Sequence, residues 1–87
     1  MLDHHDGKGK KVKVWLDTQG RKGKSVTIVS GLQHNPDTLD DIARMLKHHC
    51  GAGGTVKDRN IEIQGDQRDI VARILASAGF RPVLAGG

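Results

Sequence analysis

The chain has 87 residues, a formal net charge of +4, 36% hydrophobic and 28% charged residues, a composition compatible with one small folded domain. The single cysteine, Cys50, excludes an internal disulfide, and no Cys and His residues stand at the spacing of a four-ligand zinc site. No apolar run approaches the roughly 20 residues of a membrane span, and the first residues lack a signal-peptide core. We therefore expect a cytoplasmic protein without a metal or cofactor.

The positive charge is concentrated in one segment. Residues 8–24 carry seven basic residues against Asp17 alone, giving +6, whereas residues 25–87 carry seven residues of each sign. A local basic excess on a neutral body is typical of a protein that binds a polyanion, because each cation placed on a phosphate releases condensed counterions. The alternative is a solvated basic edge strand that only deters aggregation.

The first half of the chain is predicted to form a hairpin and a helix. Residues 11–16 and 25–30 alternate between apolar and polar side chains, and residues 17–24 between them form an exposed loop without apolar side chains. A helix is predicted over residues 37–49, and Gly51 is placed to end it in a left-handed conformation. The apolar stripe of this helix comprises Leu39, Ile42, Ala43 and Leu46.

The second half is predicted to form a second hairpin, a helix and a last strand. Residues 55–57 and 61–64 read as strands joined by a tight turn. Asp66 is expected to cap the second helix and Gly79 to end it. The apolar stripe of this helix comprises Ile70, Val71, Ile74, Leu75 and Ala78.

The last strand, residues 80–84, contains Pro82, which favours a sheet edge where a missing N–H is tolerated. The resulting order is β-β-α-β-β-α-β. It favours an α+β fold of the split β-α-β (ferredoxin-like) type, with two helices on one face of a four- to five-stranded sheet. The expected organisation is one domain over residues 11–84, with tails at residues 1–10 and 85–87.

Two motifs that could carry chemistry are weak. The tripeptide Gly23-Lys24-Ser25 resembles the end of a phosphate-binding P-loop, but Thr18 stands where that loop needs a glycine and a strand follows it. His48, His49 and Cys50 are consecutive, so on a helix they point about 100° apart and do not easily chelate one ion.

Aromatic residues are scarce. Trp15 and Phe80 are the only two, and there is no tyrosine, which argues against a sheet surface that stacks several bases. We therefore expect a basic loop that follows the phosphates of a folded RNA, held out by a rigid sheet.

Three segments of the chain resemble the eukaryotic-type translation initiation factor 1 family, the start-codon selection factors. They are GRK with VTIVSG at residues 20–22 and 26–31, CGAGGTVK at residues 50–57, and IQGDQR at residues 63–68. The likeness extends over about residues 12–80 and is closest to the compact bacterial or archaeal branch. Ala52 departs from the archaeal pattern, in which a second cysteine is frequent at this position.

The resemblance implies a monomeric, non-enzymatic factor that binds the small ribosomal subunit near the P site. There it would contact rRNA and, indirectly, monitor the pairing of initiator tRNA with the start codon of the mRNA. Carried over by position, the expected RNA-binding residues are Arg21, Lys22 and Lys24, together with Lys11 and Lys13 in the same basic segment. The expected loop near initiator tRNA holds Gly53, Gly54, Thr55 and Lys57.

Two alternatives remain open from the sequence. One is a regulatory RNA-binding or ribosome-binding protein that acts outside general initiation. The other is a small acylphosphatase-like enzyme on the same scaffold, which would need a phosphate-binding loop that enters a helix after the first strand. Here that loop enters a strand, and likeness of scaffold alone carries no function.

Overall fold

The structure is a computed structural model, and it describes residues 11–18, 25–32 and 36–85. The predicted order of five strands and two helices is confirmed, with element ends that differ from the predictions by one or two residues. The elements are β1 (Lys11–Asp17), β2 (Val26–Ser30), α1 (Pro36–Cys50), β3 (Gly54–Lys57), β4 (Asn60–Gln64), α2 (Arg68–Ser77) and β5 (Arg81–Leu84).

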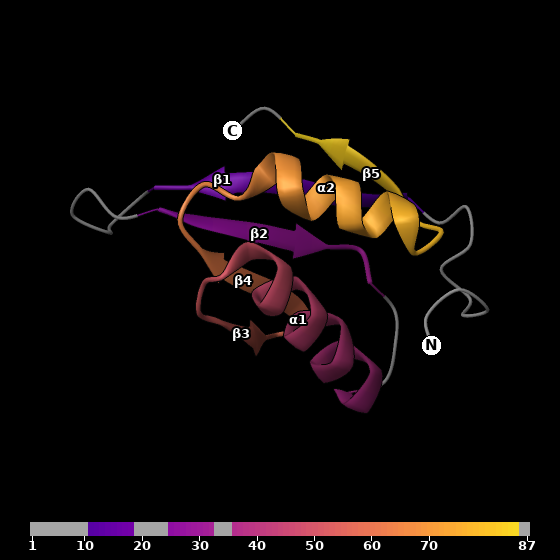
Figure 1. The fold of residues 1–87 in the computed structure, drawn as a ribbon. Helices are drawn as coiled ribbons and strands as arrows, with labels where there is room; N and C mark the ends of the chain where they lie inside the picture. Colours follow the sequence, from indigo (N-terminus) through magenta and orange to yellow (C-terminus); the bar gives the residue numbers. More distant parts are fainter. Residues whose placement is uncertain (1–10, 19–24, 33–35, 86–87) are drawn as a thin grey trace.

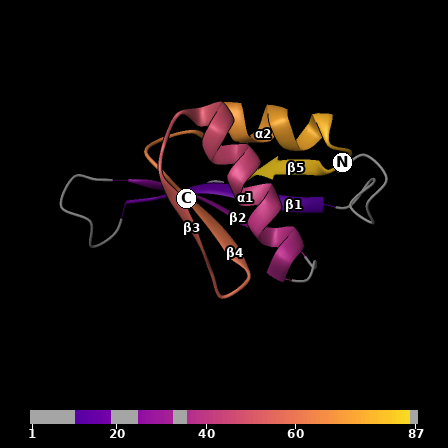
Figure 2. The same ribbon diagram turned by 60° about the horizontal axis from the view of Figure 1, so that its bottom comes forward.

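The strands form one sheet in the order β3-β4-β2-β1-β5. The β1–β2, β2–β4 and β3–β4 pairs are antiparallel, and β5 joins β1 in parallel. Both helices lie on the same side of this sheet, α1 against β3 and β4 and α2 against β1 and β5, as Figure 1 and Figure 2 show. The α+β class with two helices on one face is therefore confirmed.

The core lies between the sheet and the two helices. Val12 and Val14 of β1 and Ile61 and Ile63 of β4 are fully buried, whereas the residues between them are partly or fully exposed, as expected for strands covered on one face. The predicted stripe of α1 is confirmed, because all four of its residues are buried.

The stripe predicted for α2 is correct in four of five positions. Val71 and Leu75 are buried, and Ile74 and Ala78 are partly buried against the core. The prediction that Ile70 belongs to the buried stripe is wrong, since 39% of its surface is exposed. Successive helical residues point about 100° apart. Because Val71 points toward the core, the preceding residue, Ile70, points away from the centre of the core.

The end of α1 and the edge position of β5 follow the predictions. Gly51 has φ +63°, the left-handed conformation that ends a helix without steric cost in glycine. Directly after β5, the N–H of Ala85 donates to the carbonyl of Val14 at 2.9 Å. Since N–H directions alternate along a strand, the nitrogen of Pro82 falls on the outer edge of the sheet, where no hydrogen bond is lost.

Neither of the helices in the described part of the chain has the length and apolar character required to cross a membrane.

Candidate nucleic-acid interface

The described parts of the three segments that carry the family resemblance meet at one end of the sheet. The register aligns Asp17, the last residue of β1, with Val26 of β2, and Val26 in turn with Gln64 of β4. The N–H of Gln64 donates to the carbonyl of Gly53 at 2.8 Å. We call this row of four residues the hairpin end of the sheet. It places the base of the β1–β2 hairpin beside the chain entering β3 and the chain leaving β4.

A buried hydroxyl ties the turn after β4 to strand β2. Thr27 is fully buried, and its Oγ1 donates a hydrogen bond to the carbonyl of Gly65 and accepts one from the N–H of Gln67, each at 2.7 Å. The N–H of Gly65 also donates to the carbonyl of Ser25 at 2.8 Å. Thr27 therefore fixes the start of α2 relative to the hairpin.

Sequence reasoning missed Thr27. The available signal was a threonine at an inward-facing position of a strand whose inward neighbour is a valine. A buried hydroxyl needs a hydrogen-bond partner, but the sequence does not show which backbone groups provide it.

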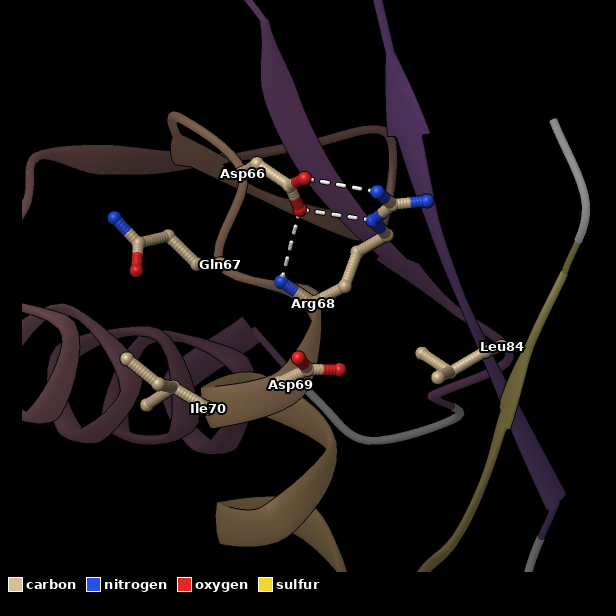
Figure 3. A pocket seen from close by; sticks show the side chains of 6 residues that line it. All are labelled: Asp66, Gln67, Arg68, Asp69, Ile70 and Leu84. Atoms are coloured by element: carbon tan, nitrogen blue, oxygen red, sulfur yellow. Dashed lines mark hydrogen bonds and ion pairs between the residues drawn. The ribbon is translucent and has the colours of Figure 1, made fainter.

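The predicted cap at Asp66 is not what the structure contains. The helix begins at Arg68, and its N-cap residue, Gln67, makes no side-chain capping bond. The Asp66 carboxylate instead accepts two hydrogen bonds from the Arg68 guanidinium at 2.8 Å each, while the Arg68 N–H is 3.5 Å from Oδ1 (Figure 3). The hydrogen bond from Arg68 holds the pKa of the Asp66 carboxyl below its ordinary value. Because both groups are largely exposed, this pair contributes little stability.

A shallow pocket of about 440 Å³ lies beside this pair, between the start of α2 and the end of β5. Two of its lining residues, Ile70 and Leu84, are among the three large apolar side chains that are exposed in the described residues. Figure 3 shows the Asp66–Arg68 pair above Asp69, with Ile70 to the left of Asp69 and Leu84 to its right.

The two glycines of the predicted tRNA-proximal loop differ in their surroundings. A Cβ on Gly54 would lie 2.5 Å from the carbonyl oxygen of Glu62 and 2.8 Å from Cδ1 of Ile63, so close backbone packing requires this glycine. The nearest atoms to a Cβ on Gly53 would belong to the side-chain amide of the exposed Gln64, at 3.2 Å, with no backbone atom among them. Gly53 is exposed, and it can accept a side chain if the Gln64 side chain shifts by a few tenths of an ångström.

The remaining predicted residues lie at different places on the sheet. Thr55 and Lys57 are exposed on β3, one edge of the sheet, and Lys11 and Lys13 are exposed on β1, next to the other edge. The structure brings Gly53 and Gly54 to the hairpin end but separates them from Lys11, which begins β1 at the far end. The predicted RNA-binding residues Arg21, Lys22 and Lys24 lie outside the described residues.

Within the described ranges, no three His, Cys, Asp or Glu side chains are grouped so that they could hold a metal ion. The rings of His48 and His49 meet edge to face, with centroids 5.5 Å apart, and Nδ1 of His49 lies 3.2 Å from the carbonyl of Met45. Cys50 packs partly buried against the core, and this burial raises the pKa of its thiol.

Comparison with known proteins places these features in a family. The family model described as translation initiation factor SUI1 matches residues 8–81. The chain is 45% identical over 76 residues to the uncharacterized protein YciH of Salmonella typhimurium, covering 87% of this chain and 70% of that protein. It is 44% identical over 70 residues to the protein translation factor SUI1 homolog of Methanocaldococcus jannaschii, covering 80% of this chain and 67% of that protein. The protein translation factor SUI1 homolog of Thermococcus gammatolerans is 41% identical over 70 residues, covering 80% of this chain and 70% of that protein.

The match extends from the basic segment through both helices to the first residue of β5, and so includes all three segments that meet at the hairpin end. The chain belongs to the translation initiation factor SUI1 family.

Proposed function

We propose that this protein binds the small ribosomal subunit near the P site through the basic β1–β2 hairpin. Arg21, Lys22 and Lys24 contact rRNA phosphates, and the loop at Gly53 and Gly54 lies close to initiator tRNA. Through these contacts the protein promotes the selection of the correct start codon. It acts in the cytoplasm as a monomeric, non-enzymatic factor.

One observation carries this proposal: the excess positive charge of the chain falls in residues 8–24, and these residues lead into a hairpin whose base is firmly held. The described end of that hairpin, Asp17 and Val26, is paired in register and linked through Gln64 to Gly53. The paired base fixes the positions at which the chain leaves β1 and enters β2, and a base that is already ordered lowers the entropic cost of binding.

The test compares the wild type with the double variant Arg21→Ala/Lys22→Ala in co-sedimentation with purified small subunits, with and without initiator tRNA. We expect the double variant to lose most of its binding while its melting temperature stays nearly unchanged, because exposed loop side chains add little stability. The matched control is Arg44→Ala/Arg73→Ala, which removes the same charge from exposed positions on the two helices.

If both double variants lose binding equally, net charge and not the hairpin governs the interaction, and the proposal fails. A reconstituted initiation assay on matched and near-matched start codons separates the two biological roles. A protein that binds subunits through the hairpin without changing codon discrimination would be a ribosome-binding regulator outside general initiation.

A further inference from the structure

The face of the sheet that carries no helix has a cluster of cations at one corner. Lys11 and Lys13 are exposed on β1, and the parallel register places Arg81 of β5 directly beside Lys11. The intervening Val12 and Val14 are fully buried on the helix side, so the three cations lie on the open side. Neighbouring strands lie about 4.8 Å apart and same-face residues on one strand about 6.6 Å apart, so these charges are close together.

This cluster does not serve the fold. Like charges held close together repel each other, and the parallel register makes Lys11 and Arg81 neighbours on adjacent strands. Among the strand residues that the structure describes, the acidic residues on the open face are Asp17, at the hairpin end of β1, and Glu62 on β4. The corner therefore has the charge that complements a bound polyanion.

The open face also carries the single tryptophan of the chain. Trp15 is two residues from Lys13 on the same side of β1 and is partly exposed. Its register partner on β2, Ile28, is only 7% exposed although no helix covers this face. The neighbours of Ile28 in register on this face are Trp15 and Glu62, so the tryptophan lies beside a buried aliphatic side chain. An aromatic ring beside an aliphatic side chain on a sheet surface provides a platform on which a base can stack.

We propose that this corner is a second RNA-binding surface, on which Lys11, Lys13 and Arg81 hold the phosphates of an unpaired RNA strand and Trp15 stacks one base. The inference rests on the proposed function and deepens it by naming the form of RNA. A duplex does not fit, because its bases are stacked inside the helix and are recognised mainly through grooves and backbone. One exposed aromatic ring takes one base, which agrees with the expectation that this sheet cannot stack several.

Intrinsic fluorescence tests the stacking contact directly, because the chain has one tryptophan and no tyrosine. The full chain is titrated with single-stranded oligoadenylate of about ten nucleotides, within the usual site size of single-strand binders. An abasic ribose-phosphate oligomer of equal length and charge is titrated in parallel. We expect oligoadenylate to quench the Trp15 emission and the abasic oligomer to bind, by competition, without quenching.

A variant series measures affinity through the anisotropy of fluorescein-labelled oligoadenylate. Trp15→Phe keeps a ring and Trp15→Leu removes it, and we expect the leucine variant to bind at least about fivefold more weakly than the phenylalanine variant. Lys13→Gln and Arg81→Gln should each weaken binding and reduce its salt dependence. Arg73→Gln, the same charge change on α2 in the other layer, should bind as the wild type does. Thermal melts of every variant establish that it is folded.

Absence of quenching, or equal affinity of the two Trp15 variants, overturns the inference. Its failure is distinct from that of the proposed function. Co-sedimentation with small subunits without any quenching overturns only the open-face surface. If oligoadenylate quenches the emission but the protein does not co-sediment with small subunits, the RNA-binding surface on the open face stands and the proposed function is overturned. The Arg21→Ala/Lys22→Ala variant should still quench fully at saturating oligoadenylate, since Trp15 is intact.

Discussion

Thr27 shows how one hydroxyl can position a helix that is distant in sequence. Its Oγ1 bonds to Gly65 and Gln67, 38 and 40 residues further along the chain, within a fully buried position. Thr27→Val keeps the shape but leaves a backbone C=O and an N–H without this partner. We expect the free energy of unfolding to fall by roughly 1 to 3 kcal/mol in urea denaturation. Thr27→Ser, which keeps the hydroxyl, should lose clearly less, and equal losses would assign the effect to packing.

The turn between β3 and β4 stores strain in two residues. Asp58 and Arg59 have φ of 51° and 66°, the left-handed region at both central positions of a two-residue hairpin loop. For L-residues this conformation costs roughly 1 to 2 kcal/mol each, and Asp-Gly is a preferred sequence for such a loop. We expect Arg59→Gly to raise the free energy of unfolding by about 0.5 to 1 kcal/mol after the added entropy of glycine in the unfolded chain. Arg59→Val should lower it, and a loss of stability in Arg59→Gly would contradict the strain argument.

At the scale of elements, the entry to β3 separates a structural glycine from a permissive one. Gly54→Ala places a Cβ against the backbone of Glu62 and forces β3 away from β4. Such overpacking costs roughly 1 to 3 kcal/mol. Gly53→Ala displaces only the side chain of Gln64 and should change the free energy of unfolding by less than about 0.5 kcal/mol. The two urea denaturation curves should therefore diverge, and coincident midpoints would show that the sheet edge relaxes freely.

The permissive position offers a test of function at the same loop. Gly53→Gln adds a side chain at an exposed position beside the hairpin end, where the nearest neighbour is the side chain of Gln64 and where we propose that initiator tRNA lies. We expect the melting temperature to be nearly unchanged and the discrimination between start codons to change in a reconstituted initiation assay. If the variant is less stable and discriminates normally per folded molecule, the loop has only a structural role.

How far the sequence predicts an element depends on whether its determinants are local. The α1 stripe and the left-handed Gly51 follow from spacing and steric rules within one helix, and both are confirmed. The start of α2 does not follow from such local rules, because it depends on a hydrogen bond to Thr27 of a distant strand. Asp66 has the residue type of a cap, but its carboxylate accepts hydrogen bonds from the Arg68 guanidinium instead. The same local rules treat Arg68 as an ordinary helical residue.

At the scale of the whole molecule, strand order converts separate segments into one surface. The order β3-β4-β2-β1-β5 brings residues near positions 17, 26, 53 and 64 into one row, although they span most of the chain. No local pattern specifies this order. The sequence therefore predicts which segments are unusual, the basic run and the glycine loop, but not that they share an end of the sheet, nor that Arg81 lies beside Lys11.

The concentration of charge in residues 8–24 predicts how binding to the small subunit depends on salt. If the protein neutralises about four to six phosphates, the logarithm of the binding constant should fall with the logarithm of salt concentration with a slope of about −3 to −5. Each removed phosphate contact should reduce the steepness by about one. Arg21→Ala/Lys22→Ala should therefore shift the slope by about two, which we would measure by co-sedimentation over a salt series.

The control for this series is Arg44→Ala/Arg73→Ala, which changes the net charge by the same amount from the helix layer. Its slope should match that of the wild type, because counterion release follows contacts made with phosphates and not the total charge of the protein. An equal change of slope in both double variants would mean that the charge acts from a distance. The basic hairpin would then guide the approach to the ribosome without being the surface that docks.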